Sequence, residues 1–171
     1  MTLVFQYGSN TSSERLNHSN RLCGDAEDLG LVYTQDNYEL DFDVWSNSND
    51  CAASDIKQGG ERKIWGVLYD VPDYLIDRST SGDRKSFDAI EGKSYERRII
   101  QVCWPDGSPV EGEVITYTVR KPQTDIKTSL DYASHIIAGL REHNATVEYI
   151  EYVKKRIISN NPELADQIQS L

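Results

Sequence analysis

Four consecutive residues combine a tight turn with groups that can bind an anion: Tyr7, Gly8, Ser9 and Asn10. They follow the apolar run Leu3–Gln6, which is typical of a short buried strand. They precede Thr11–Glu14, whose Thr-x-x-Glu spacing predicts a capping box with Thr11 as the N-cap of a helix. Backbone N–H groups at such a turn lack intrahelical partners and can bind carboxylates and oxyanions. An ordinary strand-to-helix connection explains the same residues, so both interpretations stay open.

The carboxylate of Glu91 is a second candidate for chemistry. It ends a short helix predicted from Asp83, and Gly92 is a plausible residue to terminate that helix. The negative end of a helix dipole disfavours a charged carboxylate, and a dry site would raise its pKa further. A glutamate tuned in this way can act as a general base. The alternative is a solvated surface glutamate, the usual environment of this residue type.

Several tyrosines fall on predicted strands or helices at positions that could face inward: Tyr69, Tyr95, Tyr117 and Tyr132. A buried tyrosine is usually a core residue whose hydroxyl has a hydrogen-bond partner, but it can equally position a ligand. Spacing alone does not separate these roles.

Other familiar catalytic patterns are missing from the sequence. We find no Ser/His/Asp spacing, no glycine-rich phosphate loop and no dinucleotide fingerprint. The three cysteines and three histidines are scattered, without a Cys-x-x-Cys pair or a mixed cluster, so no zinc site is expected. We therefore expect chemistry without a covalent nucleophile, a metal or a cofactor.

Composition restricts the class of protein. The 171 residues are about the length of one domain, and we expect a single domain over residues 1–171. A net charge of −10 without a basic stripe argues against a nucleic-acid surface and against anionic membranes. No stretch approaches the roughly 18 apolar residues of a membrane helix. Unpaired cysteines and the lack of a secretory signal predict a cytoplasmic protein, and a homodimer remains open.

Hydrophobic periodicity predicts strands first and helices later. Alternation over Tyr38–Val44 predicts a half-exposed strand, and apolar residues on both faces of Ile64–Val71 predict a central one. Further strands are predicted over Tyr95–Trp104 and Glu113–Val119, whereas Ser46–Gly60 is expected to be a loop around a possible short strand that includes Cys51–Ile56.

Helices are predicted in four further segments: Glu14–Leu22, a piece beginning at Pro72, Ser129–Glu142 and Thr146–Asn160. Residues 160–171 form either a short final helix or a frayed tail. This order predicts an α+β fold, a small closed or strongly curved sheet with helices outside.

Several motifs together resemble the γ-glutamylcyclotransferase-like proteins, which include the AIG2-like and butirosin-pathway cyclotransferases. The motifs follow the order of that family over most of the chain, to about residue 155. They are Tyr7–Asn10, Ala52–Ile56, Trp65–Tyr69, the Asp-x-x-Glu-Gly of Asp88–Gly92, Tyr95 with Arg97, Tyr117, and Tyr132–Gly139. The segment Asp77–Lys85 departs from the family as an additional piece.

The resemblance implies a small mixed β-barrel with flanking helices. It also implies that the Tyr7–Asn10 loop binds a glutamyl group through backbone amides and that Glu91 is the acid/base. Tyr95, Tyr117 and Tyr132 are expected to contribute to substrate binding.

The implied reaction is the cyclisation of a small-molecule γ-glutamyl amide to 5-oxoproline, with release of an amine. It would need no metal and no cofactor. A non-catalytic protein that binds a small carboxylate on the same scaffold is the alternative.

Overall fold

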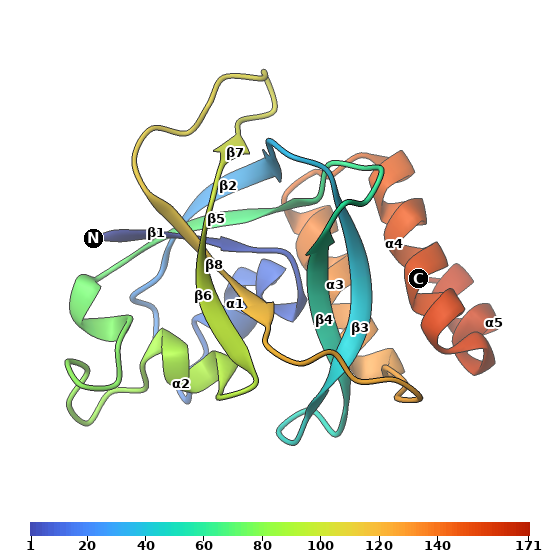
Figure 1. Ribbon diagram of the computed structural model, residues 1–171, viewed down its shortest axis with the longest axis horizontal. Helices are drawn as coiled ribbons and strands as arrows, with labels where there is room; N and C mark the ends of the chain where they lie inside the picture. Colours follow the sequence, from blue (N-terminus) through green and yellow to red (C-terminus); the bar gives the residue numbers. More distant parts are fainter.

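The computed structural model describes residues 1–171 and contains a six-stranded sheet in the order β6–β8–β1–β5–β2–β7 (Figure 1). Its strands are β1 (Thr2–Gln6), β2 (Glu27–Thr34), β5 (Trp65–Val71), β6 (Tyr95–Ile100), β7 (Val102–Cys103) and β8 (Val114–Val119). β1 is parallel to β8, and the other pairs are antiparallel. The sheet curls so that β6 and β8 cross the direction of β1 and β5, and its edge strands do not pair with each other. The predicted α+β fold with a mixed, strongly curved sheet is therefore confirmed as a half-barrel.

Both faces of the sheet are covered. In β1, Val4 belongs to a cluster of 12 buried apolar residues, and its neighbour Phe5 belongs to a cluster of 27 on the opposite face. In β5, Val67 and Leu68 divide between the two clusters in the same way, as expected because successive side chains of a strand point to opposite faces. The prediction that β5 is a central, two-sided strand is confirmed.

A separate two-stranded ribbon of β3 (Tyr38–Ser46) and β4 (Cys51–Gln58) lies beside the open edge of the sheet (Figure 1). Asp55 in β4 connects it to the sheet by accepting a hydrogen bond from Val119 N at 3.0 Å. The prediction of a loop around a possible short strand over Ser46–Gly60 underestimates the strand, because β4 spans Cys51–Gln58. Small residues with weak strand propensity fill β4, and pairing with β3 together with burial of every residue from Cys51 to Ile56 makes it a strand.

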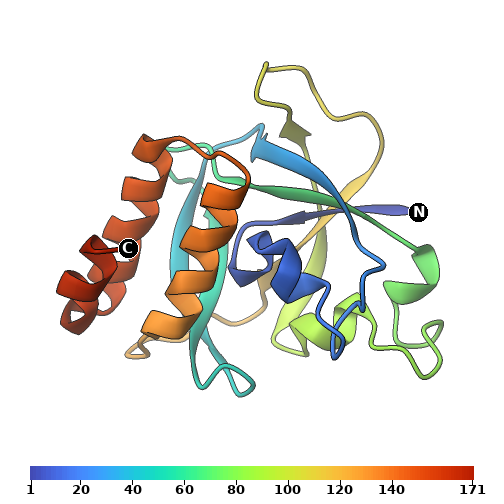
Figure 2. The ribbon, with the colours of Figure 1, turned by 180° about the vertical axis from the view of Figure 1, so that it is seen from behind.

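The helices pack on the two faces of this framework. They are α1 (Ser13–Leu16), α2 (Phe87–Glu91), α3 (Leu130–Glu142), α4 (Val147–Asn160) and α5 (Ala165–Gln169), with single turns η1 (Ser9–Thr11), η2 (Asp73–Leu75) and η3 (Pro162–Leu164). In Figure 2, α3 and α4 run side by side, and α5 lies against them. Ile168 of α5 is fully buried in the larger cluster. No helix has the length and hydrophobicity to span a membrane.

The two long helices confirm the predicted ranges, but the N-terminal helix does not. α1 is a single turn, and its N-cap is Ser12, whose Oγ accepts from Arg15 N at 3.3 Å. Thr11 is not the cap, because its hydroxyl donates instead to Gly8 O at 2.9 Å. The helix predicted from Pro72 is only the turn η2.

Candidate active site

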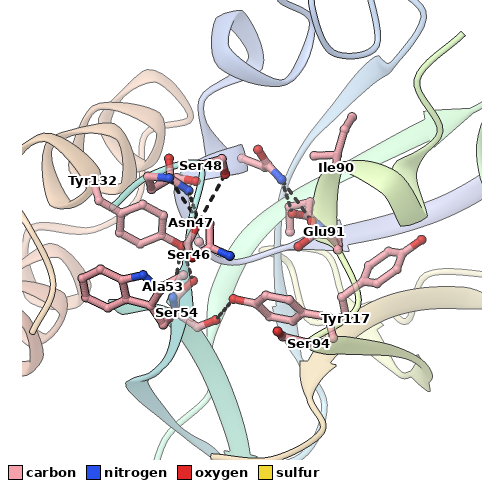
Figure 3. A pocket seen from close by; sticks show the side chains of 18 of the residues that line it. Ser46, Asn47, Ser48, Ala53, Ser54, Ile90, Glu91, Ser94, Tyr117 and Tyr132 are labelled. Carbon is pink, nitrogen blue, oxygen red and sulfur yellow. Dashed lines mark hydrogen bonds between the residues drawn. The ribbon is translucent and has the colours of Figure 1, made fainter. Parts of the chain in front are cut away.

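A pocket of ≈ 420 Å³ opens between the end of β1, the β3–β4 turn and the end of α2 (Figure 3). Each site residue expected from the sequence lines it: Tyr7, Gly8, Ser9, Asn10, Glu91, Tyr95, Tyr117 and Tyr132. Segments far apart in the sequence therefore meet around one cavity.

The turn after β1 presents main-chain donors to this pocket. The first hydrogen bond of η1 runs from Thr11 N to Gly8 O at 3.0 Å. The N–H groups of Gly8, Ser9 and Asn10 precede that bond and so have no acceptor within the turn. This arrangement suits an oxyanion or a carboxylate.

Two glycines allow this turn to lie where it does. A Cβ on Gly8 would be 2.1 Å from Ser54 Oγ, so any larger residue would collide with β4. A Cβ on Gly139 would be 2.3 Å from the carbonyl carbon of Thr11, so α3 approaches the turn only because that position has no side chain.

Glu91 is the last residue of α2, and it is half-buried on the pocket wall. Asn10 Nδ2 donates to Glu91 Oε1 at 3.1 Å, as the dashed line to Glu91 in Figure 3 shows. Burial raises the pKa of Glu91 to about 7, although the charge of Arg21 and the amides of Asn10 and Gln6 oppose this shift. A carboxyl group with that pKa can both accept and donate a proton near neutrality.

A short polar network holds the Glu91 carboxylate and was not identified from the sequence. Asn10 Nδ2 also donates to Gln6 Oε1 at 3.0 Å, and Arg21 Nη2 donates to Asn10 Oδ1 at 2.7 Å. Arg21 lies in the irregular segment after α1, where no periodicity or motif indicates which way a side chain points. Gln6 looked like an ordinary strand residue, and only its place next to the turn could have suggested a role.

The tyrosine hydroxyls in the pocket are hydrogen-bonded to the protein. Tyr7 donates to Tyr117 O and Tyr95 donates to Ser54 O, each at 2.6 Å. The Tyr132 hydroxyl accepts from Ser54 N at 3.1 Å. Burial raises the pKa of Tyr7, Tyr95 and Tyr132, so these phenols stay protonated. Their rings and bonds fix the pocket walls.

Two further tyrosine hydroxyls brace the site, one from the pocket wall and one from outside the pocket. Tyr117 donates to Asp88 Oδ1 at 2.7 Å and so connects β8 to α2, the helix that carries Glu91. Tyr69 does not line the pocket, but its hydroxyl donates to Asn10 O at 2.9 Å from the other face of the sheet. Asn10 is thus held through its carbonyl oxygen as well as through its side chain.

One group of side chains of the kind that binds metals lies outside the pocket. Donor atoms of Asp28, Glu142 and His143 lie within 4.8 Å of one another. His143 Nε2 is 2.6 Å from Asp28 Oδ2, and its Nδ1 is 2.6 Å from Gly139 O. These hydrogen bonds explain why His143 lies next to Asp28 without a metal ion.

Comparison with known proteins places this arrangement in a family. The family model described as "Gamma-glutamyl cyclotransferase, AIG2-like" matches residues 4–134. A search of curated proteins gives no significant match. The matched range contains both the turn after β1 and Glu91.

Solved structures share the fold. A structure titled "Gamma-glutamyl cyclotransferase" has a TM-score of 0.75 and 22% identity, covering 99% of each chain. An uncharacterized protein from Homo sapiens has a TM-score of 0.73 and 22% identity over 90% of this chain and 86% of its own. YkqA from Bacillus subtilis has a TM-score of 0.72 and 18% identity over 93% of this chain and 55% of its own. At these identities the likeness establishes the fold.

Proposed function

Since the chain belongs to the AIG2-like gamma-glutamyl cyclotransferase family, we propose that its pocket cyclises a γ-glutamyl amide to 5-oxoproline and releases an amine. The observation that supports this most directly is the meeting of Glu91 with the Gly8–Asn10 turn in one cavity. A cavity of ≈ 420 Å³ is in the range of small-molecule sites.

The reaction begins with the substrate's own α-amine. In its neutral form this amine attacks the γ-carbonyl carbon and forms the C–N bond of a five-membered ring. Because nucleophile and electrophile belong to one molecule, a pocket that holds the chain curled supplies much of the acceleration. The braced tyrosine walls suit that task, since their hydrogen bonds leave few alternative side-chain positions.

Glu91 carries the proton between the two nitrogens. It accepts a proton from the α-amine as the ring closes, and it donates that proton to the departing nitrogen as the original amide C–N bond breaks. A pKa of about 7 makes both transfers accessible at neutral pH. Asn10 Nδ2 holds the carboxylate in position through its bond to Oε1.

The main-chain amides of Gly8, Ser9 and Asn10 stabilise the charge that develops on the carbonyl oxygen. Fixed N–H dipoles that need no reorganisation are effective in this role. Tyr95, Tyr117 and Tyr132 shape the cavity around the glutamyl chain, with hydroxyls already bonded to the protein.

The decisive variant is Glu91→Gln. Its Oε1 can still accept from Asn10, but the amide cannot carry a proton. We expect kcat for 5-oxoproline release to fall by about 10² to 10⁴, the usual contribution of an acid/base group. The assay follows 5-oxoproline from a panel of γ-glutamyl amines and γ-glutamyl amino acids.

Glu113→Gln is the matched control, because Glu113 is exposed and lies outside the pocket. It should retain wild-type turnover. Wild-type turnover by Glu91→Gln would contradict the mechanism. Tight binding of γ-glutamyl compounds by both wild type and Glu91→Gln, without turnover by either, would instead favour a non-catalytic carboxylate-binding protein.

A further inference from the structure

A second pocket of ≈ 450 Å³ adjoins the proposed active site. Four residues line both cavities: Arg21, Ser48, Asn49 and Ile90. Ile90 directly precedes Glu91, so the two cavities adjoin beside the proposed acid/base. The remaining walls of the second pocket come from α1 with its N-cap Ser12, the segment that follows α1, Lys85 in the segment before α2, and His135 of α3.

The second pocket is basic, although the chain is strongly acidic. Arg15, Arg21 and Lys85 line it, together with His18 and His135. Its only carboxylate is Glu14, whereas the whole chain has 28 acidic residues against 18 lysines and arginines. A local excess of cations therefore stands out against a net charge of −10.

The two arginines and Lys85 have no direct ion-pair partner in the protein, although the charge of Arg21 also acts on Glu91. Arg15, Arg21 and Lys85 form none of the ion pairs found in the structure within 4.0 Å. The Nε atoms of Arg15 and Arg21 are buried without a hydrogen-bond partner. Buried donors that lack a partner are costly, so they indicate a missing acceptor.

We propose that this basic pocket binds an anionic group, a carboxylate or a phosphate, on the leaving amine of the substrate. The inference rests on the proposed function, because it takes Glu91 as the group beside the scissile bond. The substrate class is then a γ-glutamyl conjugate of an amine that carries its own negative charge.

The position of Glu91 gives the direction of the leaving group. Proton transfer requires the departing nitrogen to lie within hydrogen-bond reach of the Glu91 carboxylate. Ile90 and Arg21 line both cavities, so the basic pocket lies next to this position. An amine of a few heavy atoms with a terminal anion extends from this position into the basic pocket, and guanidinium groups bind such anions in bidentate geometry.

The β3–β4 turn closes one side of the proposed subsite. Arg15 Nη2 donates to Asn49 Oδ1 at 2.5 Å, which ties α1 to this turn. The bond uses one guanidinium donor and leaves Nε and the others for a ligand. Arg15 therefore has a fixed orientation before any anion arrives.

His135 provides a natural reporter for the pocket. Its pKa is lowered by burial and by the positive charges of Arg15 and Arg21, against the opposing charges of Asp131 and Glu14. A bound anion would offset the field of the two arginines. The pKa of His135, followed by NMR, should then rise on binding.

The experiment compares three substrates that differ only at the far end of the leaving amine: γ-glutamyl-ethanolamine, γ-glutamyl-β-alanine and γ-glutamyl-phosphoethanolamine. For the wild type we expect kcat/KM to be at least tenfold higher for one of the anionic substrates than for the neutral one. Preference for β-alanine or for phosphoethanolamine identifies the anion as carboxylate or phosphate.

The double variant Arg15→Gln/Lys85→Gln should reduce this preference at least tenfold. The control Lys121→Gln/Lys155→Gln removes the same charge from exposed positions outside both pockets and should keep it. Equal kcat/KM for all three substrates in the wild type overturns the subsite but leaves the proposed function standing.

Calorimetry with the free amines tests the pocket without turnover. Phosphoethanolamine or β-alanine should bind the wild type and raise the pKa of His135, whereas ethanolamine should do neither. If no γ-glutamyl compound is turned over, the proposed function fails, and this arm still decides the pocket. Binding of neither anionic amine, with no change at His135, overturns the inference.

Discussion

At the scale of single residues, the proposed chemistry depends on the protonation of one carboxylate. In the proposed mechanism Glu91 must be ionised to accept the proton of the α-amine, and its pKa is about 7. We therefore expect kcat/KM to fall about tenfold per pH unit as the pH drops below that value. A pH–rate profile of the wild type measures this limb.

Arg21 should set the pH at which kcat/KM begins to fall. Its positive charge favours the ionised form of Glu91 and lowers the pKa, so its removal raises the pKa. In Arg21→Gln the acidic limb should move to higher pH, whereas a purely structural loss would reduce the rate without moving it. Lys121→Gln serves as the control, because that exposed lysine lies outside the pocket. An unmoved limb in Arg21→Gln would argue against this electrostatic coupling.

Some residues of the site could be predicted from the sequence, and others could not. Gly8 and Glu91 belong to short motifs that predict a turn and the end of a helix directly from the sequence. Arg21 and Arg15 act through a tertiary approach across irregular chain, and neither has a local pattern that indicates it. Thr11 was predicted as a cap one residue too early, because Ser12 offers the same chemistry next to it.

At the scale of elements, α3 determines where the turn after β1 lies. The helix approaches the Thr11 backbone only because position 139 lacks a Cβ. Gly139→Ala should reduce the free energy of unfolding by about 1–3 kcal/mol, the usual cost of overpacking, and should also lower kcat/KM. Urea unfolding and the 5-oxoproline assay measure the two effects.

The neighbouring Ala138 is exposed on the same helix, so Ala138→Ser should change neither quantity by much. Wild-type stability and activity in Gly139→Ala would mean that α3 does not fix the turn.

The long helix itself was predictable from its apolar periodicity. The full extent of β4 was not, because residues such as Ala52 and Ser54 have little strand propensity and the pairing with β3 decides their conformation.

At the scale of the whole molecule, one core connects the pocket to the end of the chain. The cluster of 27 buried residues includes Tyr7 and Tyr132 at the site and Ile168 near the C-terminus. We propose that residues 1–171 unfold as one cooperative unit. Ile168→Ala should lower the free energy of unfolding by about 2–4 kcal/mol, because it leaves a cavity in the core.

Gln169→Ala, at an exposed position on the same helix, is the control and should be close to neutral. A neutral Ile168→Ala would mean that the C-terminal segment frays in solution. The sequence left this point open because α5 is short and lacks a capping motif, and only tertiary packing holds it.

The donors offered by Gly8, Ser9 and Asn10 are main-chain atoms, and this has a consequence for how the site can change. Replacing Ser9 or Asn10 by any residue except proline leaves its peptide N–H in place, so a change of side chain alone does not delete these donors. Under the proposed function, amino-acid substitutions can change the leaving-group end of the cavity while the donors at the glutamyl end stay the same. An ester in place of the peptide bond before Ser9 or Asn10 removes one of these hydrogens and, unlike proline, keeps the native side chain.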